Sequence, residues 1–593
     1  MKANYNKEIL SHGEDSSRSS DKNIFSDFND LFLDYLSKQT AEIESSGIHQ
    51  TFLDLSLELW NKPEKVLENQ QKAMSSLYEL WGNSFDNILS TETDKQQPKK
   101  VADKRFKHKA WNDSPYFELI KKSYLLTDNT LYAMENEIDY LDENTAKKAA
   151  FYTRQFIDAM SPANFIATNP EVIESTIQSN GTNLLKGFEN FCNDFNSESG
   201  QLRIKMADLN AFDLGTNIAI SPGKIVFENE LMQLIQYSPT TEKVFKRPLL
   251  IIPPWINKFY ILDLQPKNSF IKWLTEQGHT VFIISWVNPD ASHREKDFSD
   301  YVFQGPMAAL DAISKATDED EVNVIGYCIG GTLLSATLAY MHAKEDKRIV
   351  AASFLTSLID FSEPGDLGVF IDESQISDLE KKMNSQGFHE GKDMALSFNL
   401  LRANDLIWSF YINNYLLGKS PQKFDLLYWN SDSTRMPAKM HSTYLRKMYL
   451  ENIFKEPGGI SIGDIQIDVS TIETPSYFIS TEDDHIAPWK STYLGAQLLS
   501  GPTRFVLGKS GHIAGIVNHP DAMKYGYYTG PSPKDNADSW YTKTKSHEGS
   551  WWLDWQKWFI SVVGDEKVSA RIVGSGGLAS LEDAPGSYVR VKC

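Results

Sequence analysis

A cysteine flanked by glycines is the clearest chemical signal in the sequence. Cys328 stands in the run Gly-Tyr-Cys-Ile-Gly-Gly, residues 326–331, between an apolar segment and the small-residue stretch 332–336. This is the nucleophile-elbow pattern Gly-x-Ser-x-Gly with cysteine in place of serine, and its glycines allow a strand to turn closely into a helix. The pattern predicts acyl transfer by a cysteine thiolate. The alternative is a core cysteine beside a tight turn, because free cysteines are often buried.

A thiol needs a basic partner to ionise near neutral pH, since its ordinary pKa is about 8.5. In α/β-hydrolase folds the nucleophile is followed along the chain by an acid and then by a histidine. Asp483 and Asp484 follow one predicted strand, and His512 follows the next. Ligands bind at the carboxyl ends of strands in open α/β sheets. We therefore predict a triad of Cys328, His512 and one of the two aspartates, which the pattern does not separate. An ordinary surface histidine is the alternative for His512.

Two backbone N–H groups are candidates for an oxyanion hole. Ile329 directly follows the nucleophile at the expected helix N-terminus, and Ile256 lies in the loop after the predicted strand 248–252. His485 and His519 are interpreted as structural or supporting residues. The chain has 3 cysteines and no Cys/His cluster with zinc-ligand spacing, so neither a disulfide framework nor a metal site is expected.

The elements around these residues predict an α/β fold. After about residue 200, short apolar or β-branched runs alternate with helical segments. These predicted strands are 224–227, 248–252, 280–287, 322–325, 349–355, 476–480 and 504–507. Such alternation is typical of a largely parallel sheet with helices on both faces. Between 360 and 472 the alternation stops, and this helical, aromatic stretch is predicted to be a cap over the active site.

The N-terminal third shows helical periodicity and no convincing strand. We expect an all-helical domain over 1–205, disordered over about 1–22, followed by a catalytic domain over 206–593. The predicted helices are 24–43, 52–59, 66–88, 115–126, 146–160 and 171–195. Without further motifs, this domain is interpreted as a scaffold or an assembly surface.

Composition limits the partners and the location. A formal net charge of −20 and a pI of about 5.1 argue against nucleic acid as the main partner. The first residues lack the layout of a signal peptide, and the apolar runs are far shorter than the roughly 20 residues of a membrane span. We expect a cytoplasmic protein without a membrane span.

Taken together, the motifs resemble those of the polyhydroxyalkanoate (poly-3-hydroxybutyrate) synthases, in particular the single-subunit class I enzymes. The resemblance runs from about residue 104 to 592 and is weak over the first hundred residues. The segments that carry it are 253–258, 284–289, 326–331, 424–430, 484–489, 510–515 and 584–589.

This resemblance implies an α/β-hydrolase fold with a cap behind a helical N-terminal domain. It implies Cys328 as the acyl-carrying nucleophile, His512 as the base, and Asp484 in preference to Asp483. Trp429 matches a family tryptophan associated with the site or the dimer surface, although by pattern alone it is equally an aromatic of the cap core.

The resemblance also implies the substrate, the product and the partners. Family members take (R)-3-hydroxyacyl-CoA, release CoA and build a polyester that accumulates in cytoplasmic granules. Coenzyme A is then a substrate carrier and a product, and no resident cofactor is expected. We expect a homodimer at the granule surface, with the N-terminal domain as a candidate site for granule-associated proteins.

Two other functions compete with this interpretation. A cytosolic hydrolase of the same fold, such as a thioesterase, a lactone hydrolase or a polyester depolymerase, would use the same elbow. A non-catalytic granule-coat protein would suit the helical N-terminal third, but it would not need the Cys/Asp/His set.

Overall fold

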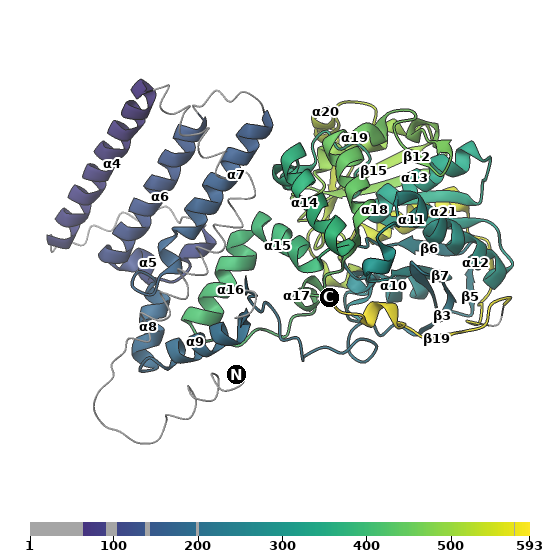
Figure 1. The fold of residues 1–593 in the computed structure, drawn as a ribbon, viewed down its shortest axis with the longest axis horizontal. Coiled ribbons are helices and arrows are strands. Elements are labelled where there is room, and N and C mark those ends of the chain that lie inside the picture. The colour runs from purple at the N-terminus through teal and green to yellow at the C-terminus, as the bar shows by residue number, and fades with distance from the viewer. Residues whose placement is uncertain (1–62, 90–102, 137–142, 197–200, 575) are drawn as a thin grey trace, which may run out of the picture.

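The computed structural model describes residues 63–89, 103–136, 143–196, 201–574 and 576–593, which form a helical part and an α/β part (Figure 1). The predicted disorder at 1–22 and the predicted helices 24–43 and 52–59 lie outside these residues.

The helical part contains α4 (Pro63–Leu89), α5 (Ala110–Asp113), α6 (Pro115–Asn136), α7 (Glu143–Ala159), α8 (Pro170–Gln178) and α9 (Thr182–Asp194). The single helix predicted over 171–195 is wrong in one respect, because it breaks into α8 and α9. Asn180 and Gly181 between them have φ angles of 50° and 82°, in the left-handed region that ends a helix. A small hairpin of β1 (Phe195–Asn196) and β2 (Gln201–Leu202) leads out of this part.

One 11-stranded sheet forms the centre of the α/β part, in the order β17-β16-β15-β14-β9-β8-β6-β7-β4-β3-β19. Its parallel strands are β6 (Leu249–Ile252), β7 (Val281–Trp286), β8 (Val322–Tyr327), β9 (Ile349–Leu355), β14 (Ser476–Thr481) and β15 (Thr503–Gly508). The antiparallel strands at the two sides are β3 (Gly223–Glu228), β4 (Met232–Tyr237), β16 (Tyr527–Thr529), β17 (Lys545–His547) and β19 (Glu582–Asp583). This order and the helical N-terminal part agree with the predicted fold class.

Strand β4 was not predicted, although all six of its residues are buried. Its sequence carries Gln233 and Gln236, which interrupt the apolar run. The amide of Gln233 donates hydrogen bonds to Glu228, Glu582 and Ser587, so its burial depends on partners far away in the sequence.

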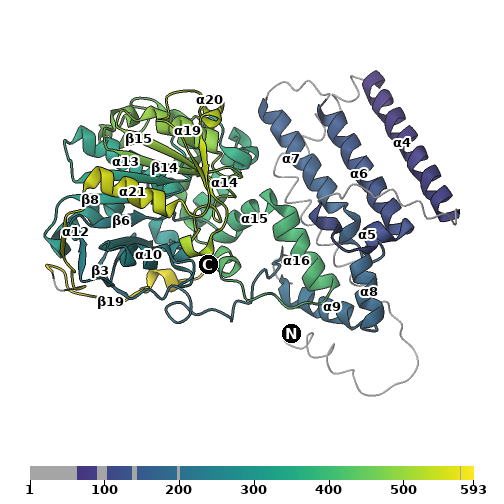
Figure 2. The ribbon, with the colours of Figure 1, turned by 180° about the vertical axis from the view of Figure 1, so that it is seen from behind.

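Helices cover both faces of the sheet. On one face lie α12 (Ala308–Thr317), α13 (Ile329–Ala343) and α19 (Trp489–Leu498), whose apolar side chains share one core. On the other face lie α10 (Phe270–Glu276) and α21 (Trp552–Val563), which bury five large aromatic side chains against the sheet (Figure 2). These are Phe270, Trp273, Trp552, Trp555 and Phe559.

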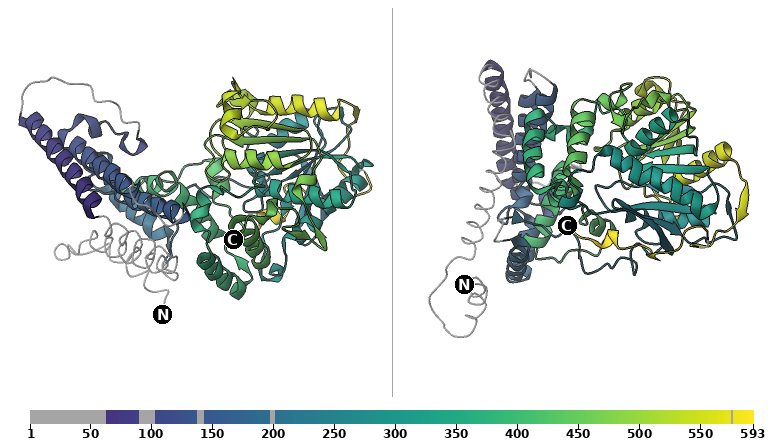
Figure 3. Two further views of the ribbon diagram at one scale, coloured as in Figure 1. Left: turned by 90° about the horizontal axis from the view of Figure 1, so that it is seen from above. Right: turned by 45° about the vertical axis from the view of Figure 1, so that its right-hand side comes forward.

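The segment between β9 and β14 is a long, mainly helical insertion. Its main elements are α14 (Glu373–Gln386), β10 (Phe388–His389), α15 (Gly391–Leu401), η7 (Asn404–Trp408), α16 (Ser409–Tyr411), η8 (Ile412–Leu416), α17 (Asp425–Asn430), β11 (Met436–Pro437), α18 (Ala438–Thr443) and η9 (Tyr444–Leu450). The middle of the insertion, from α15 to η8, runs to the helical part of the molecule (Figures 1 and 3). There Tyr415 packs on Phe191 of α9 and donates a hydrogen bond of 2.8 Å to Asp194. The insertion therefore joins the two parts, in addition to lying beside the sheet.

Within the described ranges, no helix is both long enough and apolar enough to cross a bilayer.

Candidate active site

The nucleophile elbow has the sharp geometry that the motif predicts. Cys328 stands between β8 and α13 with φ 54° and ψ −126°, a strained conformation for a residue other than glycine. A Cβ at Gly330 would lie 2.1 Å from the carbonyl oxygen of Ile252, and a Cβ at Gly326 would lie 2.5 Å from the Cα of Gly331. Both glycines are therefore required by close backbone contacts. The turn leaves Cys328 half-buried, not sealed in the core.

The carboxylate that contacts the histidine is Asp484. Its Oδ2 accepts a hydrogen bond of 2.7 Å from Nδ1 of His512, and its Oδ1 accepts bonds of 2.9 Å from the N–H groups of Ile486 and Ala487. Asp483 is exposed and makes no hydrogen bond to His512 among the described residues. Since a carboxylate only accepts, Nδ1 carries a proton, and Nε2 is the ring nitrogen left to exchange a proton with the sulfur. The geometry thus separates the two aspartates that the sequence pattern left open.

The environment of His512 couples it electrostatically to the sulfur. Burial lowers its pKa, but the negative charges and hydrogen bonds of Asp484 and Cys328 outweigh this and raise the pKa to about 10. A proton taken from the thiol is therefore held well by this imidazole. The three side chains, which come from the ends of β8, β14 and β15, meet at one edge of the sheet.

Tyr327 and His485 lie near His512. The ring of Tyr327 stacks on His512 with 5.8 Å between ring centres, and its hydroxyl donates to the His512 carbonyl at 3.4 Å. Tyr327 was not predicted as a site residue, although it stands inside the elbow motif. His485 lies close enough to Asp484 and His512 for their charges to act on it. Burial lowers its pKa to about 4, so it stays neutral. His519 instead caps a short helix by accepting a hydrogen bond from the Asp521 N–H.

The loop after β6 approaches the start of α13. The contact between Gly330 and Ile252 brings the loop 253–258 beside the elbow. The N–H of Ile329 lies in the first turn of α13, where no intrahelical acceptor exists. Ile256 belongs to the loop itself, and the oxyanion role of both N–H groups stays a prediction.

Trp429 holds the loop 253–258 in place through a hydrogen bond. Its side chain is buried, and its indole N–H donates a hydrogen bond of 2.7 Å to the carbonyl of Lys258. Thr434 likewise donates to the carbonyl of Trp255 at 2.5 Å. Trp429 is therefore hydrogen-bonded directly to the loop that carries Ile256.

Two cap tyrosines lie close to the sulfur. Tyr444 and Tyr449 belong to η9, a π-helical segment that brings residues five apart together, and their rings are 5.2 Å apart. Burial raises the pKa of both phenols, and the charge of Cys328 contributes to the increase in each. Both phenols are therefore neutral and lie within electrostatic reach of Cys328, a placement that periodicity at the usual helical spacing did not reveal.

Comparison with known proteins gives two family matches. Residues 102–274 match the family described as "Poly-beta-hydroxybutyrate polymerase (PhaC) N-terminus", and residues 247–519 match "alpha/beta hydrolase fold". Among solved structures, the α/β hydrolase GrgF from Penicillium sp. sh18 aligns with a TM-score of 0.32 and 15% identity over 49% of this chain and 91% of that chain.

Curated relatives match over nearly the full length. The "Poly(3-hydroxyalkanoate) polymerase" of Methylorubrum extorquens is 47% identical over 90% of this chain and 88% of its own length. The "Poly(3-hydroxyalkanoate) polymerase subunit PhaC" of Cupriavidus necator is 37% identical over 89% of each chain. With such identity over such a span, and with the elbow and its histidine in place, the chain belongs to the poly(3-hydroxyalkanoate) polymerase family.

Proposed function

We propose that this chain polymerises (R)-3-hydroxyacyl-CoA into a polyester, with release of CoA, through an acyl group carried on Cys328. The observation that carries the proposal is the half-buried sulfur at a strained turn, charge-coupled to a buried imidazole whose Nδ1 is 2.7 Å from a carboxylate oxygen of Asp484. Membership of the polymerase family supports the choice of substrate.

The first step transfers the acyl group to the enzyme. His512 takes the thiol proton, and the sulfur of Cys328 attacks the thioester carbonyl while the N–H groups of Ile329 and Ile256 stabilise the oxyanion. The bond from carbonyl carbon to CoA sulfur then breaks, and the CoA thiolate receives the proton from His512. One thioester replaces another, so the step is nearly balanced in free energy.

The second step forms the ester bond. The 3-hydroxyl at the end of the growing chain loses its proton to His512 and attacks the acyl-enzyme carbonyl, and the departing sulfur of Cys328 is reprotonated. An oxoester replaces a thioester, which releases free energy and drives polymerisation. Asp484 acts here by orienting and stabilising the imidazole, because both its oxygens already accept hydrogen bonds. The tyrosine-bearing cap excludes water from the acyl-enzyme.

Coenzyme A is a carrier and product in this scheme, not a resident cofactor. Family membership is also the support for two further parts of the proposal, a homodimer and a location at cytoplasmic polyester granules. Light scattering of the purified protein tests the dimer, and fluorescence microscopy of a tagged chain in polyester-accumulating cells tests the location.

The decisive test follows free thiol and turbidity after purified protein is mixed with 3-hydroxybutyryl-CoA. Wild-type protein should release CoA and form insoluble polymer. Cys328→Ala should lower CoA release by about 10⁴-fold or more, by analogy with other triads. Cys192→Ala, which removes an exposed thiol of α9, is the matched control and should behave like wild type.

Other outcomes point to other functions. Thiol release with free 3-hydroxy acid and no polymer would favour a hydrolase of the same fold. Absence of any thiol release from an intact, folded protein would favour a non-catalytic granule protein. Near-normal turnover in Cys328→Ala would remove the nucleophile assignment.

A further inference from the structure

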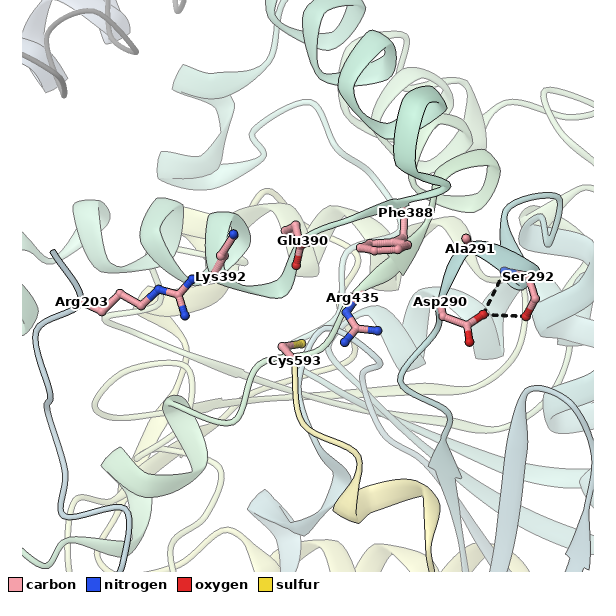
Figure 4. A pocket seen from close by; sticks show the side chains of 9 residues that line it. All are labelled: Arg203, Asp290, Ala291, Ser292, Phe388, Glu390, Lys392, Arg435 and Cys593. Atoms are coloured by element: carbon pink, nitrogen blue, oxygen red, sulfur yellow. Dashed lines mark hydrogen bonds between the residues drawn. The ribbon is translucent and has the colours of Figure 1, made fainter. Parts of the chain in front are cut away.

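A cavity of about 640 Å³ lies where the insertion, the loop after β7 and the segment after β2 meet (Figure 4). Three cationic side chains line it: Arg203 from the segment after β2, and Lys392 and Arg435 from two different parts of the insertion. This volume lies within the range of ordinary ligand sites, which is about 300–1,000 Å³. Three basic side chains around one cavity are notable in a chain whose formal net charge is −20.

Two of these cations are available for a ligand. Arg203 and Lys392 are exposed, and in the described part of the chain neither side chain has an ion-pair or hydrogen-bond partner. Arg435 is held in place, since its guanidinium lies 5.2 Å from the ring centre of Phe388 and donates 3.1 Å to the carbonyl of Pro289. The cavity thus combines one pre-oriented guanidinium with two unpaired cations.

The start of helix α15 adds positive potential to the same wall. Gly391 and Lys392 are its first residues, and Glu390 before them makes no capping hydrogen bond with its side chain. The first N–H groups of an 11-residue helix lack intrahelical acceptors and carry the positive end of the helix dipole. Such helix starts favour phosphate and other anions.

The acidic residues of the wall oppose this potential only in part. Asp290 is engaged locally, because its Oδ1 accepts hydrogen bonds from the Ser292 N–H and hydroxyl at 2.9 and 2.6 Å. Glu390 is the one acidic side chain of the wall that has no such partner among the described residues. The wall therefore carries three cations against two carboxylates, of which Asp290 is already hydrogen-bonded.

The cavity and the nucleophile lie along the same edge of the sheet. Asp290 follows the carboxyl end of β7, and β7 is separated from the β8 of Cys328 by β6 alone, a lateral distance of roughly 10 Å. The N–H of Arg435 donates a hydrogen bond of 2.9 Å to Asn288, which also follows β7. A long substrate bound at the cavity therefore extends along this edge towards the triad.

We propose that this cavity binds the phosphate groups at the nucleotide end of coenzyme A, while the pantetheine arm carries the thioester to Cys328. The proposal rests on the proposed function, because it takes a CoA thioester as the substrate. Guanidinium groups match phosphate oxygens in a two-point geometry, and lysine adds a mobile point charge. Arg203, Lys392 and Arg435 are the phosphate-binding residues of this site.

A binding experiment tests the site without catalysis. Adenosine 3′,5′-bisphosphate is titrated into the full chain by calorimetry, in wild type and in the double variant Arg203→Met/Lys392→Met. We expect the Kd to rise about tenfold or more in the double variant, because it loses two charge-assisted contacts to phosphate. Glu390→Gln should lower the Kd. Lys557→Met removes one positive charge at an exposed position of α21 and should leave the Kd unchanged.

Inorganic phosphate in the same titration separates a nucleotide site from a general anion site. It should bind at least tenfold more weakly than the bisphosphate. An unchanged Kd in the double variant, or equal binding of the two ligands, would overturn the proposal.

A kinetic comparison separates this proposal from the proposed function. The KM for 3-hydroxybutyryl-CoA should rise about tenfold in the double variant, whereas kcat/KM for the N-acetylcysteamine thioester, which has no phosphate, should not change. If wild type turns over neither substrate, the proposed function fails and the binding result still decides the site. If both substrates lose activity equally in the double variant, the cations act structurally and the phosphate site is refuted.

Discussion

At the scale of single residues, the protonation of His512 decides whether it can accept the proton of Cys328. Nδ1 of His512 donates a hydrogen bond to Oδ2 of Asp484. The other oxygen, Oδ1, accepts hydrogen bonds from two backbone N–H groups. This arrangement holds one tautomer of the imidazole and leaves Nε2 free to act as the base. The neighbouring Asp483 has the same side chain but is exposed, so it serves as an internal reference.

Asp484→Asn should therefore lower kcat by about 10⁴-fold with little loss of stability, because the amide favours the wrong tautomer of His512. Initial rates of thiol release and the thermal midpoint measure the two effects. Asp483→Asn is the control and should retain normal rates. Equal losses in the two variants would show that the orienting role is misassigned.

At the scale of elements, the absence of a side chain at Gly330 allows the start of α13 to lie against the end of β6. The start of α13 lies so near the end of β6 that a Cβ at Gly330 would lie 2.1 Å from a carbonyl oxygen. A contact below 3 Å with backbone atoms forces the elements apart. In the proposed mechanism the oxyanion hole depends on that approach, which links the spacing of the elements to catalysis.

We expect Gly330→Ala to cost about 1–3 kcal/mol of stability from overpacking and to abolish most thiol release. Denaturant unfolding and initial rates check both. Gly82→Ala in α4, where a Cβ meets no atom within 4 Å, is the matched control and should be neutral or stabilising. A stable, active Gly330→Ala would contradict the close-contact explanation.

The cap contains two buried histidines whose rings stack at 5.0 Å, His389 of β10 and His441 of α18. Burial lowers the pKa of His389 to about 4 and that of His441 well below its ordinary value, while Asp393 and Lys382 act on His389 with opposite signs. Both rings are therefore neutral in the folded cap.

This burial predicts loss of stability in acid. Below an unfolded-state pKa of about 6.5 the unfolded chain binds protons that the folded cap does not. The free energy of unfolding should therefore fall as pH drops from 6.5 towards 4, by roughly 3 kcal/mol from His389 alone. His389→Phe/His441→Phe keeps the aromatic volume and should show a smaller fall in urea midpoint between pH 7 and pH 5. An equal fall in wild type and variant would exclude these rings as the cause.

At the scale of the whole molecule, the helical part and the catalytic part are joined through the insertion. Helix α9 lies so close to η8 that a Cβ at Gly187 would be 1.7 Å from the carbonyl oxygen of Tyr415. Gly187→Val should separate the two parts, so that calorimetry shows two unfolding transitions and proteases cut the insertion between α15 and η8. Leu185→Ala, on an exposed side chain of the same helix, should keep the wild-type profile, and an unchanged profile in Gly187→Val would refute this joint.

The sequence by itself determined the elbow, the seven strands that carry apolar runs, and the order of nucleophile, acid and base. These features are local, because glycines beside Cys328 and apolar runs before Asp484 and His512 express the demands of short stretches of backbone. Strand β4 was not predicted because its buried Gln233 is satisfied by residues such as Glu582, far along the chain.

Only the tertiary structure chose Asp484 over Asp483 by geometry, since the two differ in burial and not in kind. It alone brought Tyr444 and Tyr449 together through a π-helical turn and gathered Arg203, Lys392 and Arg435 around one cavity. The cavity depends on contacts between segments as far apart as Arg203 and Arg435, and the tyrosine pair depends on a helical turn that the usual spacing does not predict. Residue type and spacing therefore determined the chemistry, and packing decided which groups stand close enough to perform it.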